Sequence, residues 1–153
     1  MTTLINRPRP VELLLVEDNS DDAELTINTL RGGSIRGLRG LRVHHVEDGE
    51  QAMAFLGREG RYGNAPRPDL ILLDLEMPRM NGLEVLAAVK EHPNWRRIPV
   101  VMMTSSSKEE HVLTAYGRHA NCYVTKPVDL DEFIEAVRSI EEFWLSFVRL
   151  PAA

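Results

Sequence analysis

Hydrophobic residues occur along the chain in two alternating patterns. Short apolar runs, typical of strands buried on both faces, are separated by longer segments whose apolar residues recur with a helical period. The runs that predict strands are residues 11–18, 41–46, 69–74, 98–103 and 121–125. The segments that predict helices are residues 19–33, 49–56, 81–90, 108–120 and 128–150. Five strands alternating with five helices predict an α/β fold, a doubly wound parallel sheet with helices on both faces.

Helix boundaries are indicated by short polar side chains, which accept hydrogen bonds from the free amides at a helix start. Asn19 or Ser20 is suited to cap the first helix, and Asp48 the second. Residues 1–10 are polar and hold two prolines, so we expect a short disordered leader there. We expect residues 11–150 to form a single domain with an extended C-terminal helix, since 153 residues suffice for one core.

Charge and composition exclude several classes of function. The 18 basic and 23 acidic residues leave a net charge of −5, and no cluster of five or more Lys or Arg occurs, so we expect no nucleic-acid binding. No apolar run approaches the roughly 20 residues that cross a bilayer, and the N-terminus is too polar for a signal peptide. We therefore expect a cytoplasmic protein without a membrane partner. The single cysteine, Cys122, excludes an internal disulfide.

Charged and polar side chains follow four of the predicted strands. They are Glu17 and Asp18, Asp74, Thr104, and Lys126. Because ligands bind at the carboxyl ends of strands in an open parallel sheet, we expect these residues to share one crevice. Two carboxylates about 5 Å apart repel by about 3 kcal/mol at an effective dielectric of 20, and the lysine offsets only part of that repulsion. A divalent cation with oxygen ligands, preferably Mg²⁺, would offset the rest.

Four segments carry a resemblance to a known family. They are VEDN at 16–19, LLDLEMPRMNG at 72–82, VVMMTSSS at 100–107 and YVTKP at 123–127. In this order and at this spacing, they resemble the receiver domain of two-component response regulators. The resemblance implies a flavodoxin-like receiver fold with five strands and five helices.

The resemblance also implies a role for each site residue. Asp74 is expected to accept a phosphoryl group from the phosphohistidine of a sensor histidine kinase, forming an aspartyl phosphate. Lys126 and the Thr104 hydroxyl are expected to bind phosphoryl oxygens. Such a protein catalyses only its own phosphotransfer and dephosphorylation, because phosphoryl transfer needs mainly positioning and charge neutralisation.

The metal ligands implied by the resemblance lie close to the phosphoacceptor in the sequence. Asp18, Asp74 and the main-chain carbonyl of Glu76 are expected to bind Mg²⁺ directly, and Glu17 mostly through water. Glu76 also lies two residues after Asp74, a position that tunes phosphate lifetime in the family.

A conformational switch is a further expectation from the family. Thr104 is expected to move towards the phosphoryl group and Tyr123 to turn into the vacated space, although a tyrosine at this position also suits ordinary strand packing. Ser106, two residues after Thr104, is expected to tune phosphate lifetime. The resemblance also suggests that the Lys126–Pro127 peptide is cis.

The last predicted helix is unusually aromatic near its end. Its core-facing residues are expected to be Leu130, Phe133, Ile134, Val137 and Ile140. Further aromatic and apolar side chains follow at Phe143, Trp144, Phe147 and Val148. They indicate an exposed patch for pairing, or alternatively an ordinary core helix.

A finer resemblance is carried by three segments of the chain. They are the C-terminal FWLSFVRLP, the NSDDAELT that starts the first helix, and the long loop before PDLILLD. Together they resemble the single-domain response regulators associated with bacterial phytochromes. That likeness implies a bacteriophytochrome kinase as partner and a homodimer formed through the C-terminal helix region.

Three other functions compete with this interpretation. A metal-dependent phosphohydrolase with an aspartyl nucleophile fits Glu76, two residues after Asp74, but such enzymes typically need a cap domain. A flavodoxin-like flavin binder needs a phosphate loop after the first strand, where EDNSDD places acids instead. A receiver-like docking module that is never phosphorylated would not need the complete set of site residues.

Overall fold

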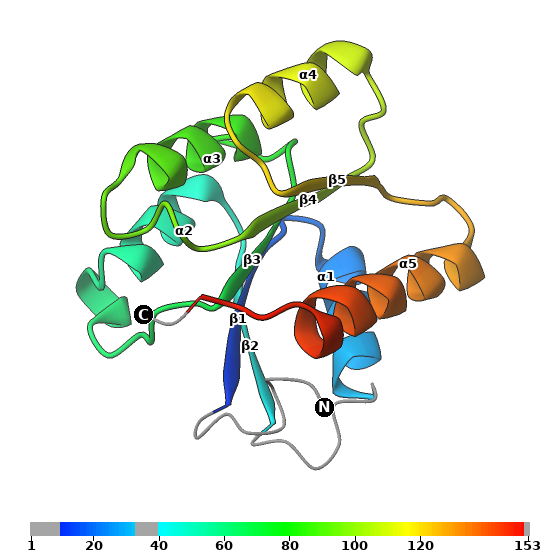
Figure 1. The fold of residues 1–153 in the computed structure, drawn as a ribbon, viewed down its shortest axis with the longest axis horizontal. Helices are drawn as coiled ribbons and strands as arrows, with labels where there is room; N and C mark the ends of the chain where they lie inside the picture. Colours follow the sequence, from blue (N-terminus) through cyan, green and yellow to red (C-terminus); the bar gives the residue numbers. More distant parts are fainter. Residues whose placement is uncertain (1–9, 33–39, 152–153) are drawn as a thin grey trace.

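A five-stranded parallel sheet, in the order β2-β1-β3-β4-β5, forms the centre of the molecule (Figure 1). The computed structural model describes residues 10–32 and 40–151, so the expected leader lies outside the described residues except for Pro10. The strands are β1 (Val11–Val16), β2 (Leu41–Val46), β3 (Leu70–Leu73), β4 (Val100–Thr104) and β5 (Cys122–Thr125). The helices are α1 (Ser20–Arg31), α2 (Gly49–Leu56), the 3-10 helix η2 (Gly60–Tyr62), α3 (Gly82–Glu91), α4 (Glu109–Gly117), α5 (Leu130–Glu142) and the π-helix η3 (Phe143–Phe147). The predicted doubly wound fold is confirmed.

The sheet separates two hydrophobic cores. Helices α1 and α5 cover one face, and α2, α3 and α4 cover the other (Figure 1). Side chains alternate along each strand with a period of two, so Leu13 and Leu15 face the core under α1 and α5. Leu14 and Val16 face the core under the other three helices. All residues of β1, β3 and β4 are buried, which explains their continuous apolar runs.

Helix starts are fixed by the predicted caps. Asn19 accepts a hydrogen bond from the amide of Asp22 at 2.9 Å, and Asp48 accepts one from the amide of Gln51 at 2.8 Å. Asn19, and not Ser20, is therefore the cap of α1. This cap lies only three residues after the end of β1, so the first turn of α1 is held close to the carboxyl end of that strand.

The crevice predicted from topology lies beside β1. This strand pairs with β2 on one side and β3 on the other, with Val16 opposite Val46 and Leu73. The loop after β1 leads to α1 on one face of the sheet and the loop after β3 leads to α3 on the other face, so the two loops diverge (Figure 1). This is the position where open α/β sheets bind ligands.

The C-terminal segment differs from the single long helix that was expected for 128–150. The α-helix ends at Glu142 and continues as a π-helix, in which the amide of Val148 donates to the carbonyl of Phe143 at 2.9 Å, five residues back. The wider turn directs Leu145 into the core, where it is fully buried, and leaves Phe147 70% exposed. The chain then becomes extended at Val148.

Two further expectations for this region are wrong. Leu130 is 59% exposed because it begins α5, one turn before Phe133, and Figure 1 shows this first turn away from the strands. The Lys126–Pro127 peptide is trans, since no cis peptide bond occurs between described residues. Trans is the form favoured before proline by about 0.5–1 kcal/mol. None of the described helices is long and apolar enough to cross a membrane.

Candidate functional site

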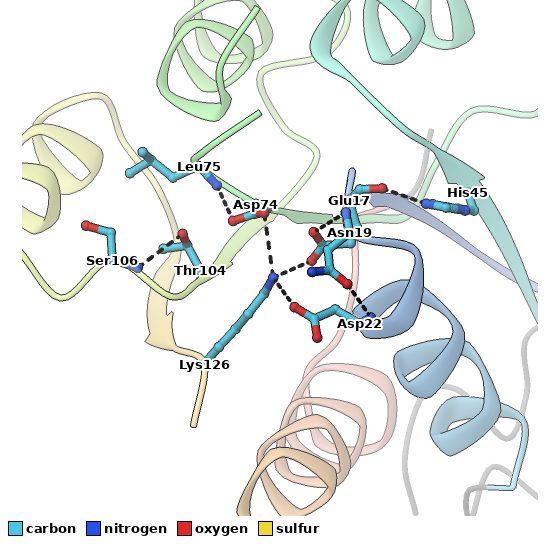
Figure 2. Close-up of polar contacts among 9 residues, drawn as sticks. All are labelled: Glu17, Asn19, Asp22, His45, Asp74, Leu75, Thr104, Ser106 and Lys126. Carbon is cyan, nitrogen blue, oxygen red and sulfur yellow. Dashed lines mark hydrogen bonds and ion pairs between the residues drawn. The ribbon is translucent and has the colours of Figure 1, made fainter. Parts of the chain in front are cut away.

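The residues that follow the strand ends meet at one edge of the sheet. Glu17 and Asp18 come from the end of β1, Asp74 from β3, Thr104 from β4 and Lys126 from the segment after β5. Figure 2 shows Glu17, Asp74, Thr104 and Lys126 directed towards a common region. An open cavity of about 510 Å³ lies there, lined by Asp18, Asn19, Ser20, Asp21, Asp22, Asp74, Glu76, Ser105 and Lys126.

Three carboxylates form the centre of this site. One carboxylate oxygen from each of Glu17, Asp18 and Asp74 lies within 4.8 Å of the other two. Each close pair of charges repels by about 3 kcal/mol at an effective dielectric of 20. Asp74 is 6% exposed and Asp18 is open to solvent, so the group is accessible from one side. Three converging oxygen donors of this kind suit a hard divalent cation, with water completing its coordination.

Backbone amides hold two of these carboxylates in place. Asp74 accepts a hydrogen bond from the amide of Leu75 at 2.8 Å through Oδ1, while Glu17 accepts one from the amide of Asn19 at 3.1 Å through Oε2 (Figure 2). The second oxygen of each acid, Asp74 Oδ2 and Glu17 Oε1, faces Lys126. The acids are thus fixed by the same main chain that ends the strands.

The ammonium group of Lys126 places a positive charge among these carboxylates. Its Nζ lies 2.6 Å from Glu17 Oε1, 2.9 Å from Asp22 Oδ2 and 3.6 Å from Asp74 Oδ2. Its side chain is 8% exposed, so these contacts are weakly screened. The sequence interpretation did not include Asp22. The signal that could have found it is the Asn19 cap, which places Asp22 in the first helical turn beside the end of β1.

Burial and charge shift two pKa values. Burial raises the pKa of Glu17 to about 7 from its ordinary 4.5, with a further increase from Asp74, although the hydrogen bond from Lys126 acts in the opposite direction. Burial alone would lower the pKa of Lys126. Its hydrogen bonds to Glu17 and Asp22, with the charge of Asp74, instead raise it to about 12. Lys126 is therefore a permanent cation, whereas Glu17 gains or loses its proton near neutral pH.

The loop after Asp74 folds back closely over the end of β3. The amide of Gly82 donates to the carbonyl of Leu75 at 2.8 Å. A Cβ atom at position 82 would lie 2.0 Å from the carbonyl oxygen of Asp74 and 2.7 Å from Leu75 Cα. Only glycine fits this approach without a shift of the backbone that carries Asp74, which explains the Asn81-Gly82 pair of the sequence.

Thr104 belongs to a second hydrogen-bonded group beside the acids. Its side chain is fully buried, and its hydroxyl accepts from the amide of Ser106 at 3.4 Å. The Tyr123 hydroxyl donates to the carbonyl of Ser106 at 2.7 Å. The Ser106 hydroxyl lies 2.6 Å from Nδ1 of His111, a contact that the polar pattern of this helix did not predict. Ser106 thus connects Thr104, Tyr123 and α4 through direct contacts.

Comparison with known proteins identifies relatives over nearly the whole chain. Residues 13–138 match the family described as response regulator receiver domain. The response regulator Rcp1 of Synechocystis sp. is 45% identical over 144 residues, which cover 94% of this chain and 95% of that protein.

Solved structures agree with this relationship. The Mn²⁺-bound form of Rcp1 has a TM-score of 0.88 and 45% identity, over 94% of this chain and 100% of the other. The phosphorylated cyanobacterial phytochrome response regulator RcpA has a TM-score of 0.87 and 45% identity, over 94% and 99%. The bacteriophytochrome response regulator RtBRR has a TM-score of 0.70 and 40% identity, over 93% and 84%.

We expect divalent-cation binding to strengthen as the pH rises through about 7. Below this pH, Glu17 holds a proton that the cation must displace, so the affinity for Mg²⁺ should fall by up to about tenfold per pH unit. Isothermal titration calorimetry with Mg²⁺ between about pH 6 and pH 8 measures the dependence. Glu17→Gln should flatten it, whereas Glu24→Gln, on the exposed side of α1, should leave it intact. An equal pH dependence in wild type and Glu17→Gln would contradict the assignment.

Proposed function

The chain belongs to the response regulator receiver domain family, and we propose that it accepts a phosphoryl group on Asp74 from a sensor histidine kinase. The observation that carries the proposal is the placement of Asp74 at the end of a rigid strand. There it faces Lys126, and Glu17 and Asp18 lie beside it. Membership of the family makes the chain a signalling protein and implies a histidine kinase as its partner.

Phosphoryl transfer would use the groups already present at the site. A carboxylate oxygen of Asp74 attacks the phosphorus of phosphohistidine, an O–P bond forms, and the N–P bond to the imidazole breaks. The released imidazole nitrogen takes up a proton from solvent. Lys126, which lies 3.6 Å from Asp74 Oδ2, would bind a phosphoryl oxygen, and Thr104 would donate its hydroxyl to another.

A magnesium ion fits the acids of the site. Asp18, Asp74 and the main-chain carbonyl of Glu76 would bind it directly, and Glu17 would contact it mostly through water. The bound ion would neutralise charge on the carboxylates and the phosphoryl group. The Mn²⁺-bound structure of Rcp1 supports a divalent ion in this family, and the oxygen donors here favour Mg²⁺.

The proposed kinase is a bacterial phytochrome. The support is the likeness to RcpA and RtBRR, whose names identify them as phytochrome and bacteriophytochrome response regulators. We place this phosphotransfer in the cytoplasm, and we infer no membrane or nucleic-acid partner for it.

A switch from Thr104 to Tyr123 is the proposed response to phosphorylation. Both residues contact the main chain of Ser106, Thr104 through its hydroxyl and Tyr123 through its phenol. Movement of Thr104 towards a phosphoryl group would therefore disturb the segment to which Tyr123 is bonded. Ser106 and Glu76 would influence the access of water to the phosphoryl group.

We further propose that the chain signals as a homodimer through its C-terminal region. Phe143 and Phe147 are 54% and 70% exposed, while Trp144 and Val148 pack partly against the core. Phe143 also contacts Trp144 edge-on, with ring centroids 5.5 Å apart. Two exposed aromatic rings four residues apart in η3 are a favourable centre for an interface.

Phosphorylation of Asp74 gives the primary test. After incubation with acetyl phosphate and Mg²⁺, intact mass spectrometry should find one added phosphoryl group on the wild type and none on Asp74→Asn. Asp131→Asn, which changes an exposed acid of α5, should behave as the wild type. A modified Asp74→Asn protein would contradict the proposal. Sustained hydrolysis of an aryl phosphate beyond one equivalent would favour the phosphohydrolase instead.

The pairing with a phytochrome is tested by phosphotransfer from a purified kinase. An autophosphorylated bacteriophytochrome should transfer its phosphoryl group to this chain, and an unrelated sensor kinase should not.

The switch is tested by Thr104→Ala. Loss of one hydroxyl contact should slow phosphorylation by no more than about tenfold, because such a hydrogen bond contributes about 0.5–1.5 kcal/mol. The NMR signal of the Tyr123 ring should move on phosphorylation in the wild type and remain still in Thr104→Ala. Thr125→Ala, at the exposed position opposite Thr104 on β5, should retain the movement. A tyrosine signal that moves equally in all three proteins would exclude the coupling.

The dimer is tested by light scattering at micromolar concentration. The wild type should have the mass of two chains, and Phe147→Ser should shift it towards one chain, because the largest exposed ring of the patch is removed. Leu113→Ser, which changes a residue that is 64% exposed on α4, should leave the mass unchanged. A monomer with and without acetyl phosphate would rule out this proposal.

A further inference from the structure

Two loops at the end of the sheet opposite the phosphoacceptor carry a cluster of arginines. One loop, 57–68, follows α2, and the other, 92–99, follows α3. Both lie at the left of the view in Figure 1. They contain a single carboxylate, Glu59, in a protein whose net charge is −5. Their five cations are Arg58, Arg61, Arg67, Arg96 and Arg97. We call these arginines, with Tyr62 and Trp95, the arginine surface.

The two loops are joined to each other through Arg67. Its guanidinium donates a hydrogen bond to the main-chain carbonyl of Asn94. Burial and then the charge of Arg97 lower the pKa of Arg67, while Asp69 acts in the opposite direction. The positive charges of the two loops are therefore close enough to repel each other, and this repulsion would be relieved by a negatively charged ligand.

The arginines of this surface form no close ion pair within the described part of the chain, although the charge of Asp69 acts on Arg67. Among the residues that the structure describes, none of the five forms an ion pair with a carboxylate, whereas Arg42 and Arg79 elsewhere each do. Aromatic rings lie among them, with the Arg61 guanidinium 4.9 Å from the centre of the Tyr62 ring. Lysine is absent from both loops. Arginine with tyrosine and tryptophan, and without lysine, is the composition enriched at the centres of protein interfaces.

Arg58, Arg67 and Trp95 of the arginine surface line a small cavity. It has a volume of about 210 Å³ and is lined by Leu56, Arg58, Arg67, Pro68, Asn94 and Trp95. The Trp95 ring stacks on His92 with centroids 3.8 Å apart, which holds the indole in place. Sites for drug-sized ligands and cofactors have volumes of about 300–1,000 Å³, so this cavity suits a single side chain better than a nucleotide or other cofactor.

We propose that the arginine surface binds an acidic segment of a partner protein, with one aspartate or glutamate side chain in the Arg58–Arg67–Trp95 cavity. Guanidinium groups bind carboxylates through two parallel hydrogen bonds, and the outer arginines would pair with neighbouring acids of the same segment. Arg67 and Asp74 lie seven positions apart, which corresponds to about 23 Å in extended chain. The segment therefore binds without contacting the phosphoacceptor, and its affinity does not depend on phosphorylation.

The proposal is tested by NMR with the full chain and two peptides, hexaglutamate and hexaglutamine. The chain has two tryptophans, so their indole N–H signals report on two separate places, Trp95 in the cavity and Trp144 in η3. Hexaglutamate should shift the Trp95 signal saturably and leave Trp144 unchanged, with and without acetyl phosphate. Hexaglutamine should shift neither signal.

Two double variants locate the binding. Arg58→Gln/Arg97→Gln should weaken hexaglutamate binding about tenfold, as expected for the loss of two exposed ion pairs. Arg96→Gln/Arg97→Gln changes only two exposed side chains and should also weaken hexaglutamate binding. This variant replaces the first one if the first does not fold. Arg31→Gln/Arg138→Gln removes the same charge from α1 and α5 and should bind as the wild type.

Three results would overturn the proposal. They are an equal Trp95 shift with hexaglutamine, equal weakening in the α1/α5 control variant, and full displacement of hexaglutamate by an equal concentration of inorganic phosphate. The last result would mean that the surface binds small anions and has no preference for an acidic segment.

Discussion

Repulsion between carboxylates at the carboxyl edge of the sheet is the constraint on which the rest of the structure depends. Glu17, Asp18 and Asp74 are placed together by two paired strands, β1 and β3, whose side chains fill both cores. Lys126 pairs with Glu17 and Asp74 and offsets part of this repulsion. The site is therefore prepared for a cation and an incoming phosphoryl group by a rigid apolar interior.

Sequence patterns predicted the fold and the meeting of Glu17, Asp18, Asp74 and Lys126 at one edge of the sheet, because both depend on local rules. Apolar runs place strands, polar caps place helices, and parallel topology brings strand ends together. The likeness to phytochrome-associated response regulators is also confirmed by the comparisons. Asp22 and His111 escaped this reasoning because their contacts come from the tertiary fold: Asp22 meets a lysine 104 residues later, and His111 bonds to a loop serine.

The errors lie where several conformations satisfy the same pattern. The apolar spacing at the end of the chain is satisfied by a continuous α-helix and also by α5 followed by the π-helix η3. In both arrangements an apolar side chain faces the core, so the pattern does not distinguish them. Leu130 has the right spacing but no core beneath it at the helix start. The trans peptide before Pro127 reflects a preference that sequence likeness does not decide.

The π-helix at the end of α5 gives the aromatic patch its direction. A continuous α-helix advances about 100° per residue, which would place Phe147 nearly in line with the buried Ile140 and would turn Leu145 outward. The extra residue in the turn changes the angular phase, so leucine fills the core and phenylalanine faces solvent. The same sequence wound as a continuous α-helix would therefore bury Phe147 and expose Leu145. In this protein, the pitch of a single turn decides which side chain faces solvent.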